Sequence, residues 1–229
     1  MLNFTNRKRH IAEMKIFSRK MALALAFAAM VAAPSSARTV RDFFANEEGG
    51  IFASLPHDRR LDMLDYYEAG QQMPMTNNFG GTAVIDTLTS DYLRLRTSGS
   101  SHVELLLATS RRDTVLYVVT TCLLPAADSH VTVYDTNWNT LDTERYFKVP
   151  QITDFISIPK GDKTRREDVA RDIKLPTIEY SFDPTSRQLT ATHTIKGTMT
   201  VEGYTAVKPY LTDTLTYQLK GTKIKSMRN

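Results

Sequence analysis

The chain has 229 residues, of which 24% are charged and one is a cysteine, so an intramolecular disulfide is excluded. Its 29 Lys and Arg exceed its 25 Asp and Glu, but six of these basic residues and only one acidic residue lie in the first 37 positions. The remaining 192 residues have a net charge of −1. This argues against a nucleic-acid-binding protein, which needs a positive field to attract phosphates.

Residues 1–37 have the three parts of a secretory signal peptide: a basic start, an apolar run from Met21 to Ala33, and small residues ending at Ala37. Met14 is an alternative start. The apolar run is too short to cross a bilayer, which takes roughly 20 residues, and no later run is comparable. Arg38, not a cysteine, follows the cleavage position, so no lipid anchor is expected. We therefore predict a periplasmic or secreted product without a transmembrane segment.

Two helices are predicted at the start of the mature chain. Thr39 and Asp42 have the spacing of a capping box, which begins a short helix. A second helix is expected over residues 54–70, because its apolar residues recur at helical spacing. We place Leu61, Leu64 and Tyr67 on its apolar face, and Arg59, Arg60, Asp62 and Asp65 on its polar face.

From Thr82 the apolar residues alternate with polar ones, which is typical of strands, and short polar turns separate the segments. For one hairpin the alternation predicts a register, with Leu95 opposite Val103 and Arg94 opposite Glu104. The predicted strands cover residues 82–88, 92–97, 102–108, 114–123 and 129–134.

The strand at 114–123 is apolar on both faces, so we place it at the centre of the sheet and expect Cys122 to be a small core residue. Residues 160–174 are highly charged with mixed signs and are expected to form a solvated helical turn or a mobile loop. His193 falls on a core face, where we expect a structural imidazole with a hydrogen-bond partner. Further strands are predicted at residues 178–182, 189–195, 198–202 and 211–220, with threonines on the solvent side.

The predicted fold class is α+β, with short N-terminal helices packed on a mainly antiparallel β-sheet. Residues 38–229 are expected to form a single domain. A seam at residues 159–176 is the alternative boundary, although the roughly 50 residues after it would make a marginal domain alone.

Asp128-Ser129-His130 contains the residue types of a hydrolytic triad, but adjacent strand residues point to opposite faces and do not converge. Asp128 and His130 could begin a metal site with His102 or Glu104, and a zinc site needs three protein ligands. No nucleophile elbow, dinucleotide fingerprint or metal-binding helix motif occurs. We therefore assign no catalytic residue, metal or cofactor.

Several motifs resemble an uncharacterised Bacteroidetes family of exported proteins, a domain of unknown function. They are Asn77-x-Phe79-Gly80-Gly81, Asp91-Tyr92, the apolar strand ending at Cys122, and Pro125-x-x-Asp128-Ser129-His130 leading to Tyr134 and Trp138. The resemblance extends roughly from Thr39 to Phe155. It implies a Gram-negative envelope and supplies no catalytic residues.

We predict a non-enzymatic envelope protein that binds an unknown envelope protein or a small ligand through a sheet face or the Trp138 loop. The candidate ligand-binding residues are Asp128, His130, Tyr134 and Trp138. Two alternatives remain open. One is a hydrolase or metal-dependent enzyme that uses Asp128 and His130, and the other is an assembly subunit with an exposed edge strand.

Overall fold

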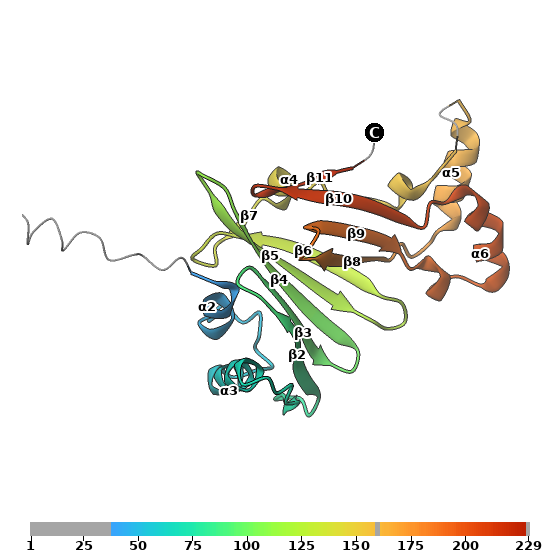
Figure 1. Ribbon diagram of the computed structural model, residues 1–229. Coiled ribbons are helices and arrows are strands. Elements are labelled where there is room, and N and C mark those ends of the chain that lie inside the picture. Colours follow the sequence, from blue (N-terminus) through green and yellow to red (C-terminus); the bar gives the residue numbers. More distant parts are fainter. Residues whose placement is uncertain (1–37, 159–160, 228–229) are drawn as a thin grey trace, which may run out of the picture. The chain divides into compact units, whose positions relative to one another are not determined.

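Two antiparallel β-sheets and several short helices make up the structure, which is a computed structural model (Figure 1). It describes residues 38–158 and 161–227, and the chain from Arg38 onward forms one compact unit. The signal peptide predicted at residues 1–37 lies outside the described residues. The mixed α+β class, with helices near the start and mainly antiparallel strands, is confirmed.

The first sheet is a seven-stranded meander in which each strand pairs with its sequence neighbours. The predicted hairpin register is confirmed, because Leu95 pairs with Val103 and Arg94 with Glu104. The apolar face of each of the two strands and the short turn between them together determine this register. The strands are β1 Met75–Thr76, β2 Thr82–Leu88, β3 Tyr92–Ser98, β4 Ser101–Thr109, β5 Thr114–Cys122, β6 Asp128–Tyr134 and β7 Thr140–Leu141.

Strand β5 is buried on both faces, as predicted, although β4 is the middle strand of the seven. Cys122 is exposed, so the prediction of a core cysteine is wrong. It is the last residue of β5, where the strand passes the edge of the buried core, and its thiol is directed to the carbonyl of Leu124 at 3.5 Å.

The second sheet has the strand order β11-β10-β9-β8. Along β9 and β10 the apolar residues are buried while Thr190, Thr192 and Thr216 are partly exposed, which confirms the predicted division into a core face and a solvent face. The strand Lys223–Ser226 was not predicted. The bounds are β8 Ile178–Asp183, β9 Gln188–His193, β10 Thr214–Lys220 and β11 Lys223–Ser226.

The strand predicted at residues 198–202 is wrong, because helix α6 (Val201–Val207) begins there. The Thr200 hydroxyl accepts a hydrogen bond from the Gly203 amide at 3.1 Å and caps this helix. The charged stretch contains helix α5 (Lys163–Asp172). Helix α4 (Thr143–Tyr146) and three 3₁₀ turns, η1 (Ile152–Phe155), η2 (Ile195–Gly197) and η3 (Lys208–Tyr210), complete the connections.

Helices α2 (Val40–Ala45) and α3 (His57–Glu68) pack on one face of the first sheet, against Leu93, Leu105 and Leu116. The capping box predicted at Thr39 and Asp42 is present. Arg60 of α3 is buried, contrary to the predicted polar face. Its guanidinium donates to the Glu47 carbonyl at 2.7 Å and lies 3.4 Å from the Glu47 carboxylate.

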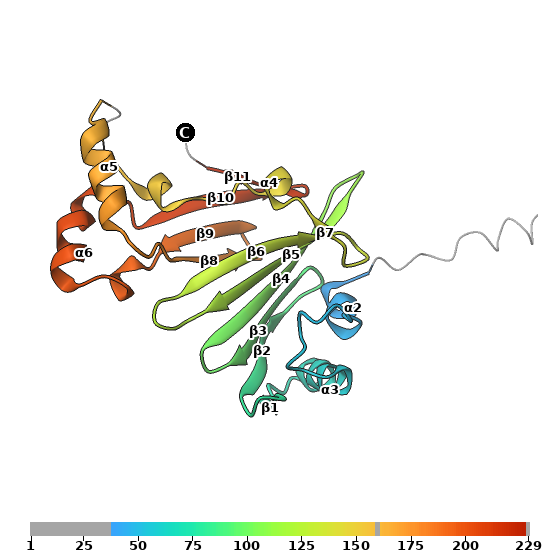
Figure 2. The same cartoon turned by 180° about the vertical axis from the view of Figure 1, so that it is seen from behind.

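The second sheet covers the opposite face of the first, and the two share a core (Figures 1 and 2). Alternation along the strands explains the two cores, because Tyr92 and Tyr117 face the second sheet while their neighbours Leu93 and Leu116 face the helices. A third, smaller core lies around α5 and α6. None of the helices in the described part of the chain is long and apolar enough to cross a membrane.

Candidate ligand-binding site

Asp128, the first candidate residue, lies at the start of β6 and joins the two sheets. Its carboxylate accepts a hydrogen bond from the Ile178 amide of β8 at 3.0 Å. The next residue, Ser129, accepts one from the Tyr180 amide at 3.0 Å. These side chains pair amides on the outer edge of β8 that no neighbouring strand pairs, which is a structural role for this part of the motif.

His130 is exposed and lies on the other face of β6 from Ser129. The strand pairing aligns Glu104 with Val119 and Val131, so Glu104 faces the second sheet while His130 does not. The pair His130 and Glu104 is therefore separated by the sheet itself. Within the described residues no three His, Cys, Asp or Glu side chains form a group that could hold a metal ion.

Tyr134 and Trp138 lie together at the far end of β6 from Asp128. Their ring centroids are 5.4 Å apart, and the Trp138 ring also meets Phe43 of α2 at 6.0 Å. The backbone φ of Trp138 is +64°, an uncommon value for a large side chain. This conformation places the indole between helix α2 and the sheet, where its Nε1 is buried and has no hydrogen-bond partner within the part of the chain that the structure describes.

The loop that carries Trp138 is held by one carboxylate. Asp135 accepts hydrogen bonds from the Asn137 and Asn139 amides at 2.8 and 2.9 Å, and from the Asn139 side chain at 2.8 Å. The Asn139 side chain and these amides lower the pKa of Asp135, because each donor favours the ionised form. The four candidate residues thus form two separate groups, Asp128 with His130 and Tyr134 with Trp138, at opposite ends of β6.

Glu104 is the most buried carboxyl group between the sheets, with 1% of its surface exposed. It accepts a hydrogen bond from the Phe182 amide of β8 at 3.0 Å, lies 3.2 Å from the Arg94 guanidinium, and is bonded by the Tyr92 hydroxyl. Burial raises the pKa of Glu104, because desolvation outweighs its donors. Sequence analysis predicted the pairing of Arg94 with Glu104 but not the contact with β8.

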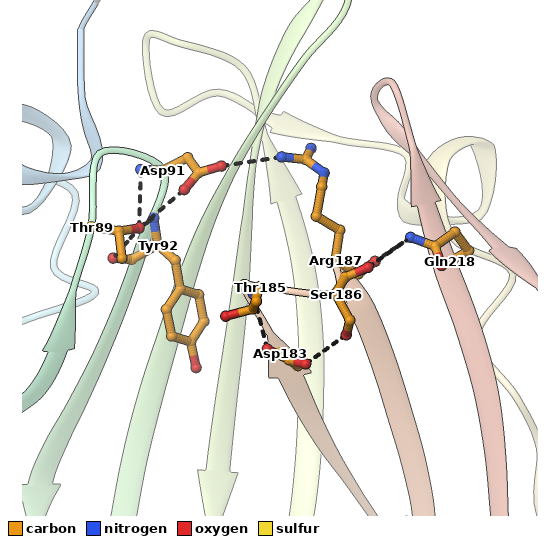
Figure 3. A network of polar contacts seen from close by, with 8 residues as sticks. All are labelled: Thr89, Asp91, Tyr92, Asp183, Thr185, Ser186, Arg187 and Gln218. Atoms are coloured by element: carbon orange, nitrogen blue, oxygen red, sulfur yellow. Dashed lines mark hydrogen bonds and ion pairs between the residues drawn. The ribbon is translucent and has the colours of Figure 1, made fainter.

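A third link between the sheets lies at their other end (Figure 3). The Arg187 guanidinium donates to the Asp91 carboxylate at 3.2 Å, and Asp91 is itself bonded by the Thr89 hydroxyl at 3.0 Å. On the neighbouring strand β10, the Gln218 side chain donates to the carbonyl of Ser186, the residue before Arg187, at 3.1 Å. The Asp91-Tyr92 motif therefore contacts the second sheet through both of its residues, Asp91 by an ion pair and Tyr92 by its ring 5.8 Å from that of Phe182.

Two buried histidines have ring nitrogens without a hydrogen-bond partner among the described residues: both nitrogens of His193, and Nε2 of His102. His193 is on the core face as predicted, but neither ring nitrogen has a hydrogen-bond partner, so the expected partner is absent from the described residues. Its ring contacts Phe155 edge-on at 5.6 Å. Burial lowers the pKa of His193, and burial together with Arg94 lowers that of His102, so both imidazoles are held neutral.

A pocket of about 350 Å³ lies beside β11 and was not predicted from the sequence. Two basic residues, Lys148 and Lys225, and one acidic residue, Asp154, line it. Neither lysine has an ion-pair partner within the described part of the chain. Pro150, Tyr217, Ile224 and Ser226 complete the lining.

The edge strands of the two sheets are relevant to the alternative of an assembly subunit with an exposed edge strand. Strands β1 and β7 have two residues each, and the outer amides of β8 at Ile178, Tyr180 and Phe182 are bonded by side chains of the first sheet. Strand β11 carries two lysines and is bridged through Ile224 to Phe147. Short, covered or lysine-bearing edges resist edge-to-edge pairing, so they do not favour an assembly subunit.

These features define a class of protein: an α+β scaffold in which a seven-stranded meander lies between two helices and a smaller sheet. The chain belongs to the family described as "Protein of unknown function (DUF3256)", whose model matches residues 32–224. This confirms the resemblance to an uncharacterised family.

A solved structure with the same fold is that of a domain of an uncharacterised protein from Porphyromonas gingivalis W83, a member of the Bacteroidetes. It is 22% identical to this chain with a TM-score of 0.70, and the match covers 82% of this chain and 98% of that one. No curated protein matches the chain. At this identity the likeness establishes the fold alone.

Proposed function

We propose that this chain is an exported, non-enzymatic envelope protein that binds a small anionic ligand in the pocket beside β11. The observation that carries the proposal is the presence of Lys148 and Lys225 in one pocket without ion-pair partners among the described residues. Ammonium groups donate charge-assisted hydrogen bonds to carboxylates and phosphates. The leader-like composition of residues 1–37 supports export.

The rest of the pocket favours an anion with an apolar part. Pro150 and Ile224 contribute apolar surface, and the Tyr217 ring lies beside them. A volume of about 350 Å³ is at the small end of the range for small-molecule sites. A ligand of this kind would place its charge near the lysines and its apolar body over Ile224.

Titration of residues 38–229 by NMR with benzoate and with its neutral isostere benzamide tests this chemistry. We expect saturable shifts at the pocket with benzoate only, and their loss in the variant Lys148→Met/Lys225→Met. Lys223→Met is the matched control, because Lys223 lies on the same strand outside the pocket lining. Equal binding of benzamide, or equal loss in the control, would contradict the proposal.

The Trp138 loop is the second candidate surface, for a protein partner that also contacts Tyr134. It is favoured by the φ of +64° and by the Trp138 Nε1, which has no hydrogen-bond partner among residues 38–158 and 161–227. Asp128 and His130 would belong to a separate contact at the other end of β6. Partner capture from envelope extract that survives Lys148→Met/Lys225→Met but is lost in Trp138→Phe would favour this loop over the pocket.

Export is tested separately by N-terminal sequencing of the native protein. We expect the mature chain to begin near Arg38, in a periplasmic or extracellular fraction. A chain that begins at residue 1 or at Met14 would refute processing while leaving the ligand proposal intact.

A further inference from the structure

Three of the most exposed large apolar side chains lie on turns or at a helix start near one end of the structure. Phe79, Leu124 and Val201 are exposed by 83, 69 and 79%. They lie in three segments, residues 77–81, 123–127 and 197–201, which together with the turn at residues 97–101 we call the turn rim. Figures 1 and 2 show the β1–β2, β3–β4 and β5–β6 turns at the same end of the first sheet, with α6 beyond them.

Contacts between the segments establish that the turn rim is continuous. The Asn77 side chain donates to the Thr97 carbonyl at 2.8 Å, and the Leu123 amide donates to the Ser100 carbonyl at 2.8 Å. The backbone at Gly197 packs directly on Ala126, because a Cβ at Gly197 would lie 2.9 Å from the Ala126 side chain. Each segment therefore touches the next.

The turn rim carries no charged residue, although 24% of the whole chain is charged. Its segments read Asn-Asn-Phe-Gly-Gly, Thr-Ser-Gly-Ser-Ser, Leu-Leu-Pro-Ala-Ala and Gly-Thr-Met-Thr-Val. Flanking charges are mixed in sign, because Arg96, Asp128, Lys196 and Glu202 are next in sequence, and Arg96 is paired with Asp86. An uncharged surface of this kind neither attracts nor repels an anionic partner electrostatically.

The backbone amides of the turn that presents Phe79 are paired by hydrogen bonds within the protein. The Asn77 side-chain oxygen accepts hydrogen bonds from the Phe79 and Gly81 amides at 2.9 Å each, and the Gly80 amide donates to the Asn77 carbonyl at 3.1 Å. Gly80 has a φ of +78°, which suits glycine. Because these amides are already paired, moving the turn out of water leaves no donor unsatisfied.

We propose that the turn rim docks on an electrically neutral lipid surface, with Phe79 and Leu124 inserted at the headgroup level. A protein partner of ordinary affinity needs about 800 Å² of continuous complementary surface on each side. The turn rim instead offers separate projecting apolar tips with hydroxyl-bearing residues between them, an arrangement that a fluid interface can accommodate. The segments themselves contain no Lys or Arg, and the charges that border them are of both signs, which points to zwitterionic rather than anionic lipid.

Flotation of residues 38–229 with phosphatidylcholine vesicles tests the proposal. We expect co-flotation that changes less than about twofold between 0.1 and 1 M NaCl, since no charge pair contributes. The variant Phe79→Ser/Leu124→Ser should lower partitioning at least about tenfold, which corresponds to 1.4 kcal/mol. Met73→Ser is the matched control, because Met73 is an exposed apolar residue outside the turn rim.

Orientation provides a second readout. Trp138, the single tryptophan, lies near the opposite end of β6, about 20 Å from the turn rim along the strand. Brominated lipid should leave Trp138 fluorescence unquenched, whereas the indole introduced by Phe79→Trp should be quenched.

Absence of co-flotation overturns the proposal. So does binding that requires anionic lipid and disappears in high salt, since that behaviour would assign the contact to lysines elsewhere. Self-association that is lost in Phe79→Ser/Leu124→Ser, without vesicle binding, would assign the turn rim to a second copy of the chain.

Discussion

Replacement of Glu104 tests how the two sheets are held together. Glu104→Ala removes the acceptor for the Phe182 amide and for the Tyr92 hydroxyl, both buried between the sheets. Each buried group left unpaired costs about 1–3 kcal/mol, and breaking a buried charge pair costs about 3–5 kcal/mol. We expect Glu104→Ala to lower the free energy of unfolding by ~4 kcal/mol.

Glu104→Gln is the matched comparison. Its side-chain oxygen can still accept from the Phe182 amide, and its NH₂ group can donate to the Tyr92 hydroxyl oxygen. Arg94 loses its partner but is 33% exposed at the side chain, so water can solvate the guanidinium. We expect a loss of about 1 kcal/mol or less, because removal of the buried charge offsets the lost ion pair.

The pH dependence has a definite sign. The folded-state pKa of Glu104 is raised above its ordinary value of 4.5, so the folded protein holds this proton more tightly than the unfolded chain does. Stability from this group is therefore fully present below pH 4.5 and is lost as pH rises through the folded-state pKa. Relative to Glu104→Gln, the wild type should gain stability as pH falls from 8 toward 4.5.

Urea unfolding of the three proteins at several pH values measures both effects. A ~4 kcal/mol loss in Glu104→Ala would also lower Tm by roughly 8–16 °C for a chain of this size. If Glu104→Gln is as unstable as Glu104→Ala, the stability comes from the Arg94–Glu104 ion pair within the first sheet and not from the pairing of the β8 amide between the sheets. If wild type loses stability relative to Glu104→Gln in acid, the pKa of Glu104 is lowered and the reasoning is refuted.

Three further predictions concern single residues. Tyr117→Phe should cost about 1–2 kcal/mol in urea unfolding, because the buried hydroxyl donates to the Thr222 carbonyl at 2.8 Å. Burial lowers the folded-state pKa of His193, so the stability that the neutral imidazole contributes is present above pH 6.5 and is lost as pH falls from there through the folded-state pKa. His193→Phe should reduce this loss of stability in acid, which cannot exceed about 1.4 kcal/mol per pH unit for one group. Gly80→Ala should cost about 1–2 kcal/mol through its φ of +78°, while Gly99→Ala, which has open space and no such φ, should be near neutral by the same assay.

Local patterns in the sequence were sufficient to predict most of the first sheet. In β3 and β4 the alternation of Leu93 and Leu95 with Arg94, and of Val103 and Leu105 with Glu104, allows one register with aliphatic residues on one face. The two-residue connection, Gly99-Ser100, restricts any slip, and a register shift between Arg96 and Ser98 adjusts the pairing beside it. Both determinants lie within 15 residues of each other, so they can be evaluated without knowing the rest of the fold.

Helix α6 shows where local propensity fails. Thr198, Thr200 and Val201 are β-branched and favour a strand, but the Thr200 hydroxyl caps a helix whose Val207 packs in the third core. That core includes Ile156 and Val169 from distant parts of the chain. Tertiary packing therefore decides the conformation of residues 198–207, and the sequence near residue 200 alone does not contain the residues that provide this packing.

The candidate sites also depend on residues that are distant in sequence. Lys148 and Lys225 meet in one pocket because the segment after α4 runs beside β11, with Phe147 bridged to Ile224. Likewise the β8 amides find their acceptors at Asp128 and Glu104, 50 and 78 positions away. Neither arrangement has a local signal, since each partner alone looks like an ordinary polar residue.

The turn rim lies between these two cases, because part of it can be predicted from the sequence and part requires the strand order. That each of its turns lacks charge is visible in the sequence, and so is the place of Phe79 between Asn78 and Gly80, whereas its exposure is known only from the structure. A meander places alternate turns at the same end of a sheet, so the turns at residues 77–81, 97–101 and 123–127 must lie together once the strand order is known. The turns at residues 89–91 and 110–113 gather at the opposite end and carry Asp91, Arg111, Arg112 and Asp113. This segregation of charge between the two ends of one sheet is what distinguishes a docking surface from a chance run of small residues.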